Sequence, residues 1–312
     1  MFKKILFATN ISPACDHAAR VAFDLAKRYN AELIVFYAPG VPTRGFSQFV
    51  MNTRTGEKVI YGEEYLRQVK QEMKNTYRDL IEKCERYTLE ASPGIPHMEV
   101  LRIARKRDVD LIIMGSSTRE KDERSNFYRK IVGSTLQAVA KAARCPVLVI
   151  GRPAASFWGG FSNIVFGTDF SKASDAAFLF AYKIAKALEC TLHIFHALDI
   201  SSIYSGKVVE QHEIEDSIRE TREKMKKMYV TKMEGFDDYE LEVWEGIPYV
   251  EIVKYAREKY ADLIVMAHHT REPDPEKALL GSTMEQVVLR ATCPVVSVNR
   301  PGKVENPKPS KC

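Results

Sequence analysis

The sequence predicts an α/β protein built from two repeated halves, each an open parallel sheet with helices on both faces. Two observations carry this prediction. Short apolar runs alternate along the chain with segments of helical periodicity, which is typical of a parallel sheet covered by helices. The chain also aligns with itself in three successive blocks: 4–39 with 163–198, 94–120 with 246–272, and 133–153 with 281–301. A duplication of this kind sets the number of domains directly.

The length of 312 residues fits two domains of ordinary size. The blocks place the first domain at residues 1–152 and the second at 160–301. A stretch containing Gly, Pro and Ser separates them. Residues 302–312 are rich in Lys and Pro, and we expect them to form a disordered tail.

The elements of the first half are expected in the order strand, helix, strand, ending on a strand. Five strands are predicted, at 5–9, 33–38, 88–90, 110–114 and 147–150. Four helices connect them: one capped by Ser12 with Pro13 in its first turn, one over 63–86, one opened by Pro96 and one begun by Ser134. The second half repeats this order.

Composition excludes several classes of protein. Hydrophobic residues make up 45% and charged residues 28%, which is typical of a globular domain. The net charge of +5 arises from basic and acidic residues mixed along the chain, so nucleic acid is not an expected partner. No apolar run approaches the length of a membrane helix, and the six cysteines show no metal-type spacing, so we expect a cytoplasmic protein with reduced thiols.

Ligands of open parallel sheets bind beyond the carboxyl ends of the strands, where the strand order reverses. Three pairs of segments fall at that edge: 9–12 and 168–171, Ala38 and Ala197, and the Gly-Ser-Thr runs at 133–135 and 281–283. A Gly-Ser-Thr at a helix start offers free N–H groups, hydroxyls and the positive end of the helix dipole, which together favour a phosphate. The alternative interpretation is an ordinary helix cap.

Four sets of motifs resemble the universal stress protein family over both halves. They are Ile-Leu-Phe-Ala-Thr-Asn-x-Ser and Ile-Val-Phe-Gly-Thr-Asp-x-Ser, Asp-Leu-Ile-Ile-Met-Gly and Asp-Leu-Ile-Val-Met-Ala, the two Gly-Ser-Thr runs, and Cys-Pro-Val before each last strand. The resemblance implies a Rossmann-like fold that binds adenine nucleotide. It also implies tandem or dimeric association, and a role in stress response rather than in a defined metabolic reaction.

Both halves depart from the pattern of the family's ATP-binding members, which have an Asp after the first strand and Gly-x-x-Gly, nine residues, then Gly-Ser or Gly-Thr. The first half has Asn10 for the Asp, keeps Gly115, replaces the second glycine by Thr118, and has fourteen residues before Gly133. The second half keeps Asp169 but has Ala267 and Thr270 for the glycines, and ten residues before Gly281. A Cβ at such a glycine obstructs the approach of phosphate, so the first half is the favoured site.

The residues that the resemblance points to for nucleotide binding are Ala8, Thr9, Asn10, Ala38, Gly115, Thr118, Gly133, Ser134 and Thr135 in the first half, and Thr168, Asp169, Ala197, Gly281, Ser282 and Thr283 in the second. Basic residues of the long loop before Gly133 would offset phosphate charge: Arg119, Lys121, Arg124, Arg129 and Lys130. The expected cofactor is ATP or AMP, with Mg²⁺ as an accompanying ion.

Other constellations favour structural roles. His268 and His269 are adjacent and lack a third ligand, and His193 and His196 fall on opposite faces of a strand, so no metal site is predicted. Cys145 and Cys293 precede buried strands and are interpreted as small core residues rather than a redox pair. Signatures of hydrolases, kinases and P-loop enzymes are absent from the sequence, and no catalytic residue is predicted.

The segment 40–62 of the first half predicts a hairpin, because β-prone runs at 46–51 and 57–61 flank a turn containing Gly56. Two interpretations stay open for it: an excursion that covers the sheet, or a lid or docking arm.

The leading hypothesis is a tandem stress-response protein that binds adenine nucleotide as a sensor or regulator. The alternative is a degenerate scaffold that acts through an unknown protein partner without nucleotide. Weak ATP hydrolysis ranks last. Because the last strands, 147–150 and 295–298, are apolar, we expect the halves to pair through them as an intrachain pseudo-dimer; whether chains also form homodimers stays open.

Overall fold

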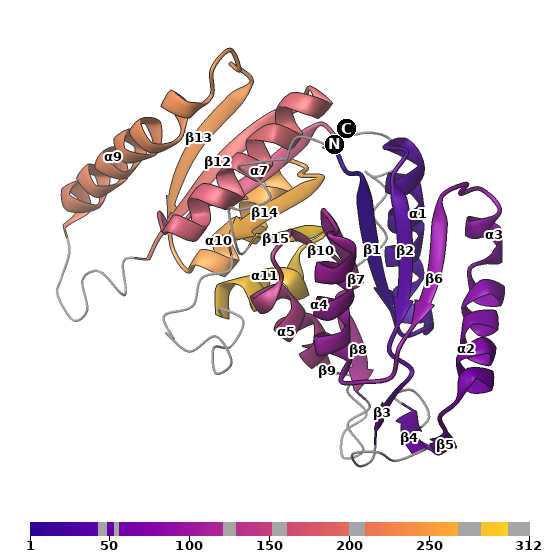
Figure 1. Ribbon diagram of the computed structural model, residues 1–312. Coiled ribbons are helices and arrows are strands. Elements are labelled where there is room, and N and C mark those ends of the chain that lie inside the picture. The colour runs from indigo at the N-terminus through magenta and orange to yellow at the C-terminus, as the bar shows by residue number, and fades with distance from the viewer. Residues whose placement is uncertain are drawn as a thin grey trace. The chain divides into compact units, whose positions relative to one another are not determined.

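The computed structural model describes residues 1–42, 49–52, 56–120, 129–151, 161–199, 210–267 and 282–298, with the backbone alone at 41, 42, 117–120, 129–132 and 282. The chain divides into two compact units, Met1–Pro153 and Ala154–Cys312. Each is an α/β unit and is described by itself (Figure 1). The pairing of the two halves stays a prediction.

The first half contains a parallel sheet of five strands, all five expected from the sequence. They are β1 (Lys4–Thr9), β2 (Glu32–Tyr37), β6 (Tyr87–Ala91), β7 (Leu111–Gly115) and β10 (Val147–Ile150). Their spatial order is β10-β7-β1-β2-β6, and every neighbouring pair is parallel. The order therefore reverses between β1 and β7, which is the place where such sheets bind ligands.

Helices cover this sheet in two layers. They are the 3₁₀ turn η1 (Pro13–Cys15), α1 (Asp16–Arg28), α2 (Glu63–Thr76), α3 (Arg78–Ile81), α4 (Pro96–Arg107) and α5 (Ser134–Ala142). Helix α1 packs on β1, β2 and β7 and contacts α3, whereas α4 packs on β1 and contacts α5. The starts of α4 at Pro96 and of α5 at Ser134 are as predicted.

The second half repeats this architecture. Its strands are β11 (Asn163–Gly167), β12 (Thr191–Leu198), β13 (Tyr239–Glu245), β14 (Leu263–Ala267) and β15 (Val295–Val298), in the order β13-β12-β11-β14-β15 and all parallel. Its helices are α7 (Lys172–Leu188), α9 (Gln211–Met228), the 3₁₀ turn η2 (Val230–Lys232), α10 (Pro248–Glu258) and α11 (Ser282–Arg290). The predicted fold class, two repeated parallel sheets with helices, is confirmed.

A carboxylate fixes the start of the first strand in each half. Asp110 Oδ2 accepts hydrogen bonds from the backbone N–H groups of Lys3 and Lys4, at 2.8 and 2.9 Å. Asp262 Oδ2 does the same for Ser162 and Asn163, at 2.6 and 3.0 Å. These bonds satisfy N–H groups at the end of a buried strand, where an unpaired donor would be costly.

Two details of the first half differ from the prediction. The helix expected over 63–86 is broken at Tyr77, where the backbone leaves the helical region at φ −106° and ψ 20°. The break lets the Tyr77 ring, 2% exposed, pack edge-on against Phe7. The other difference is at Ser12, which makes no side-chain cap bond; η1 intervenes and α1 begins only at Asp16.

The predicted hairpin of 40–62 is present and has a third strand. β3 (Gly40–Pro42), β4 (Phe49–Asn52) and β5 (Lys58–Ile60) form a small antiparallel sheet. The segment before Gly133, expected to be one long loop, instead contains the antiparallel pair β8 (Ser117–Glu120) and β9 (Arg129–Val132). The sequence of this segment is rich in charged residues and lacks the alternation of apolar and polar residues that predicts a strand. The two strands are held together by backbone pairing, which the side-chain pattern does not report.

Several predictions fall outside the described residues: the tail 302–312, the His268–His269 pair, Thr270, Gly281, and the loop side chains from Thr118 to Lys130. Among the helices described, none is long and apolar enough to cross a membrane. The described part of the chain also holds no group of three His, Cys, Asp or Glu side chains arranged to bind a metal.

Candidate functional site

A cavity of about 600 Å³ opens in the first half at the carboxyl edge of the sheet. It lies at the ends of β1, β2 and β7 and at the start of α5, where the strand order reverses. Eight of the nine first-half residues predicted for the site line it: Ala8, Thr9, Asn10, Ala38, Gly115, Gly133, Ser134 and Thr135. The ninth, Thr118, lies on β8 with its side chain outside the description.

One set of residues around the cavity is apolar. Phe36, Tyr37 and Ala38 come from the end of β2, Met51 from β4, and Pro96 and Val100 from the first turns of α4. Another set is polar but uncharged, formed by Thr9, Asn10, Asn52, Ser134 and Thr135. No Asp, Glu, Lys, Arg or His is found among the described lining residues, so this cavity can take an apolar ring and a polar group but offers no side-chain charge.

The amino terminus of α5 faces this cavity. Its N-cap is Gly133, with φ −61° and ψ 138°, and no side chain caps the helix. The capping interpretation of Ser134 and Thr135 is therefore wrong in this half. The N–H groups of the first turn, with the positive end of the helix dipole, line the cavity as an anion-binding feature.

Asn10 is held by its own loop. Its Oδ1 accepts hydrogen bonds from Ser12 N at 3.1 Å, Ser12 Oγ at 2.6 Å and Cys15 Sγ at 3.1 Å. Because the carbonyl oxygen is used in this way, the Nδ2 amide is the group left to meet a ligand, and it can only donate. An acceptor of the ligand, such as a hydroxyl oxygen or a ring nitrogen, fits this position.

Gly115 is needed at the end of β7 for packing. A Cβ built there would lie 3.2 Å from the carbonyl oxygen of Ala14 in η1. The glycine thus lets the η1 backbone come close to the strand end, and both segments line the cavity.

One residue that shapes the loop after β1, Tyr77, was not predicted from the sequence. The hydroxyl of Tyr77 lies 2.5 Å from Thr9 Oγ1, which also accepts the N–H of Ile11 at 2.9 Å. Burial raises the pKa of Tyr77, so its phenol stays neutral and can donate. The available signal was the self-alignment: Tyr77 and Tyr229 stand at the same spacing as Gly94 and Gly246.

The second half repeats this loop with the same bonds. Thr168 Oγ1 lies 2.5 Å from the Tyr229 hydroxyl and accepts the N–H of Phe170 at 3.0 Å. Asp169 Oδ1 accepts hydrogen bonds from Ser171 N at 3.0 Å and Ser174 Oγ at 2.5 Å. Ser171 caps α7 by accepting the Ser174 N–H. This is the role that the sequence predicted for its first-half counterpart, Ser12.

Aromatic rings occupy the second-half counterparts of Ile11 and Tyr37. The Phe170 ring lies 4.6 Å from the His196 ring, and Lys224 Nζ of α9 lies 4.1 Å from the centre of Phe170. His196 Nδ1 bonds the Thr168 carbonyl oxygen at 2.8 Å, and burial lowers the pKa of this histidine. Ala197 is buried at the end of β12 and Thr283 lies in the first turn of α11; the side chain of Ser282 is outside the description.

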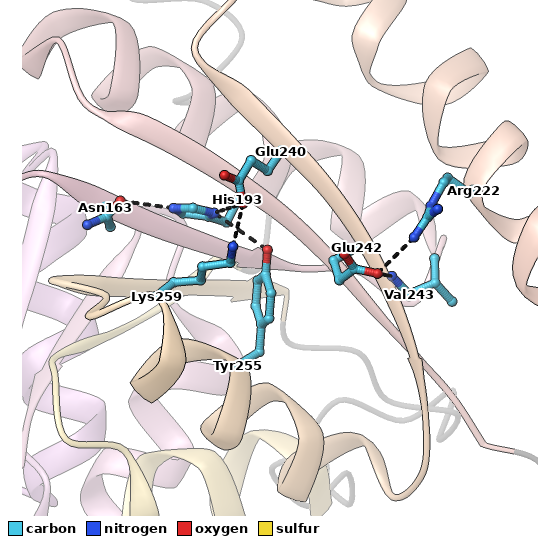
Figure 2. A network of polar contacts seen from close by, with 8 residues as sticks. All are labelled: Asn163, His193, Arg222, Glu240, Glu242, Val243, Tyr255 and Lys259. Atoms are coloured by element: carbon cyan, nitrogen blue, oxygen red, sulfur yellow. Dashed lines mark hydrogen bonds and ion pairs between the residues drawn. The ribbon is translucent and has the colours of Figure 1, made fainter.

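His193 forms a separate polar network on the other face of β12 (Figure 2). Its Nδ1 lies 3.1 Å from Glu240 of β13, and its Nε2 lies 2.9 Å from Asn163 Oδ1 of β11. Tyr255 of α10 and Lys259, which directly follows this helix, complete the network, with Lys259 Nζ 2.7 Å from Glu240. Burial lowers the pKa of His193. The opposite faces predicted for His193 and His196 are confirmed.

The two cysteines before the last strands differ in detail. Cys145 is 5% exposed, whereas Cys293 is partly exposed as a residue. Burial of the Cys293 thiol nevertheless raises its pKa to about 12. Both fit the interpretation as inert core thiols rather than a redox pair.

A sequence model described as the universal stress protein family matches residues 1–151 and 160–299. Universal stress protein MJ0531 of Methanocaldococcus jannaschii is 34% identical over 159 residues, 49% of this chain and 84% of that protein. The crystal structure of a universal stress protein from Archaeoglobus fulgidus superposes with a TM-score of 0.65 at 19% identity, over 95% of this chain and 96% of that one. A universal stress protein solved in complex with cAMP matches 45% of this chain and 97% of its own length, at 27% identity and a TM-score of 0.32.

Proposed function

The chain belongs to the universal stress protein family, and on this premise we propose that its first half binds an adenine nucleotide as a sensor or regulator, without turning it over. The single observation that carries the proposal is the cavity of about 600 Å³ at the switch point of the first sheet. Its volume lies in the range of about 300–1,000 Å³ that is typical of small-molecule sites.

The two kinds of lining match the two ends of a nucleotide. The apolar side chains of the β2 end, β4 and α4 suit a purine base, which gains from leaving water. The uncapped start of α5 suits the phosphate, and Asn10 Nδ2 suits an acceptor on the ribose between them.

The absence of charge among the described lining residues bears on affinity. Helix α5 supplies about half an elementary charge at its amino terminus, so a phosphate there is only partly neutralised. The basic residues of 119–130 would supply the remainder, as the sequence suggests. We expect binding of about micromolar strength, with a preference among ATP, ADP and AMP set by the reach of those residues.

Turnover is not part of the proposal. In-line attack on a phosphoryl group requires a group that positions the nucleophile and usually metal ligands. The described lining residues contain no carboxylate and no histidine. Their hydroxyls and amide can bind and orient a nucleotide.

Calorimetric titration of the full chain with ATP, ADP and AMP, with Mg²⁺ present, tests the proposal. Gly133→Val should abolish binding, because the branched side chain would stand where the phosphate approaches, while the conformation of Gly133 (φ −61°, ψ 138°) tolerates valine. Gly281→Val is the matched variant of the second half and should change binding little.

Three results would count against this assignment. Loss of binding in both variants would show that both halves are needed for binding. Loss in Gly281→Val alone would show that the second half binds the nucleotide. A parent chain that neither binds nucleotide in the titration nor retains one through native purification, as mass spectrometry would show, supports the scaffold alternative.

A further inference from the structure

The small sheet of β3, β4 and β5 contributes to the cavity from outside the parallel sheet. Met51 and Asn52 of β4, and Gly56 before β5, line the cavity together with the ends of β1, β2 and β7. Met51 is 37% exposed. A ligand bound in the cavity would cover the apolar surface of Met51 that is now exposed to solvent.

This small sheet is fixed to the fold by close backbone contacts. A Cβ on Gly40 of β3 would lie 2.9 Å from the Met51 carbonyl oxygen and from the Val50 side chain, which is 1% exposed. Gly40 in turn accepts the N–H of Gly94, before α4, at 2.7 Å. Tyr65 of α2 links the middle strand β4 to the fold, accepting from Asn52 Nδ2 at 3.3 Å and donating to the Pro39 carbonyl oxygen at 3.4 Å.

The end of β4 is also held by backbone hydrogen bonds. Asn52 and Glu57 pair through Asn52 N at 2.8 Å, and Gly56 N donates to the Asn52 carbonyl oxygen at 2.9 Å. Gly56 has φ +72°, a conformation that glycine adopts without steric cost. Met51 is therefore presented by a strand that is anchored on both sides.

The apolar groups that line the cavity together with Met51 indicate which end of the ligand it meets. They include Tyr37 and Ala38 at the end of β2 and Pro96 and Val100 of α4. The phosphate end is assigned to the α5 terminus. A thioether makes favourable contacts with an aromatic ring, often at the ring edge.

Resting on the proposed function, we propose that Met51 packs against the base of the bound nucleotide. It is a specificity residue that favours an aromatic base over a bare sugar phosphate. The anchored strand β4 holds Met51 in place before the ligand binds, so binding costs little additional ordering of this side chain. Strand β4 is then part of the binding site rather than a cover for the sheet.

The test compares AMP with ribose 5-phosphate by calorimetric titration of the full chain. We expect Met51→Ala to weaken AMP binding about five- to tenfold, because the base would keep more of its apolar surface in water, and to leave ribose 5-phosphate binding unchanged. Met51→Leu should retain most of the AMP affinity because it keeps the volume. Phe49→Ala is the matched control: it lies on the same strand, two residues away, outside the cavity lining, and should not change either affinity.

The outcomes separate this inference from the proposed function. If the parent binds AMP and Met51→Ala binds it equally well, or loses affinity for both ligands to the same extent, the assignment of Met51 to the base is wrong while the nucleotide site stands. If the parent binds neither ligand, the proposed function fails and the inference falls with it. A drop for Phe49→Ala matching that for Met51→Ala would show a general disturbance of β4 and would also overturn the assignment.

Discussion

The loops after the first strand of each half share a backbone and differ in the side chains around it. Thr9 and Thr168 each bond a buried tyrosine at 2.5 Å. The residue two positions later is left-handed in both, with φ 58° at Ile11 and φ 60° at Phe170. Such a conformation is unusual for a non-glycine residue, so its repetition shows that the duplicated fold preserves the loop geometry.

The side chains on that common backbone separate the two halves. Where the first half has Tyr37 beside a cavity, the second has His196 bonded to the loop carbonyl and packed on Phe170. Ser12 makes no side-chain cap bond at η1, whereas its counterpart Ser171 caps α7. The comparison teaches that the two halves differ in a few side chains at the sheet edge, while packing maintains the loop itself.

The largest effect is expected for Phe170→Ala. The Phe170 ring contacts the His196 ring, and Lys224 Nζ lies over it. Alanine at the same φ of 60° has the same backbone strain, so the substitution removes only the ring contacts. Because Phe170 is only half-buried, we expect a loss of about 2 kcal/mol in the free energy of unfolding of the second half. Urea denaturation would measure it. Lys224→Met, which keeps the apolar stem, should cost about 0.5 kcal/mol; an unchanged midpoint for Phe170→Ala would remove the packing role of this ring.

A smaller and symmetrical effect is expected for Tyr77→Phe and Tyr229→Phe. Each removes one buried hydrogen bond to a threonine hydroxyl and keeps the ring packing on Phe7 or Phe166. We expect about 1 kcal/mol of destabilisation in each case. Equilibrium unfolding of the two variants side by side is the measurement. Clearly unequal values would break the equivalence of the two loops.

Ser171→Ala and Ser12→Ala should have different effects on stability and on nucleotide binding. Ser171 caps α7, so its loss should cost about 1 kcal/mol of stability. Ser12 caps no helix, but its hydroxyl bonds Asn10 Oδ1, so its loss should affect stability less and should weaken nucleotide binding by freeing the Asn10 amide. Unfolding and calorimetric titration of both variants would show this crossing pattern. Equal stability losses with unaltered binding would contradict it.

The smallest effect is expected in the dependence of stability on pH. Burial lowers the pKa of His193 below the ordinary value of 6.5, so the unfolded chain binds its proton at a higher pH than the folded chain does. The resulting stability is present above pH 6.5 and is lost progressively as the pH falls below it. Lys259, through its hydrogen bond, lowers the pKa of Glu240 below 4.5, so a further loss follows at still lower pH.

Two variants on β13 test the sign. The Glu240 carboxylate raises the pKa of His193 against burial, so Glu240→Gln should lower it further. Glu242→Gln is the control, because Glu242 pairs with Arg222 of α9 and not with the histidine (Figure 2). NMR titration of the His193 ring protons gives the pKa directly. A value above 6.5 in the parent would show that the imidazolium is the buried form and would reverse the expected pH dependence.

The sequence by itself determined the fold class and predicted most of the residues that line the cavity of the first half. Periodicity and the internal repeat located the sheet strands, because a strand buried on both faces has to be apolar along its whole length. The residues that follow β1, β2 and β7 and begin α5 were found as well. Parallel strands bring their carboxyl ends to one edge, and eight of the nine first-half residues expected there do line the cavity.

Only the tertiary structure decided which side chains complete or fill each site. Tyr77 and Tyr229 were missed because their partners, Thr9 and Thr168, lie 68 and 61 residues away, and a hydroxyl on a helix end carries no local pattern. Three other features were missed for the same reason. They are the break of the second helix at Tyr77, the place of Met51 in the cavity lining and the Phe170–His196 contact. Each depends on packing between segments distant in sequence, and periodicity reports only on the faces of a single element.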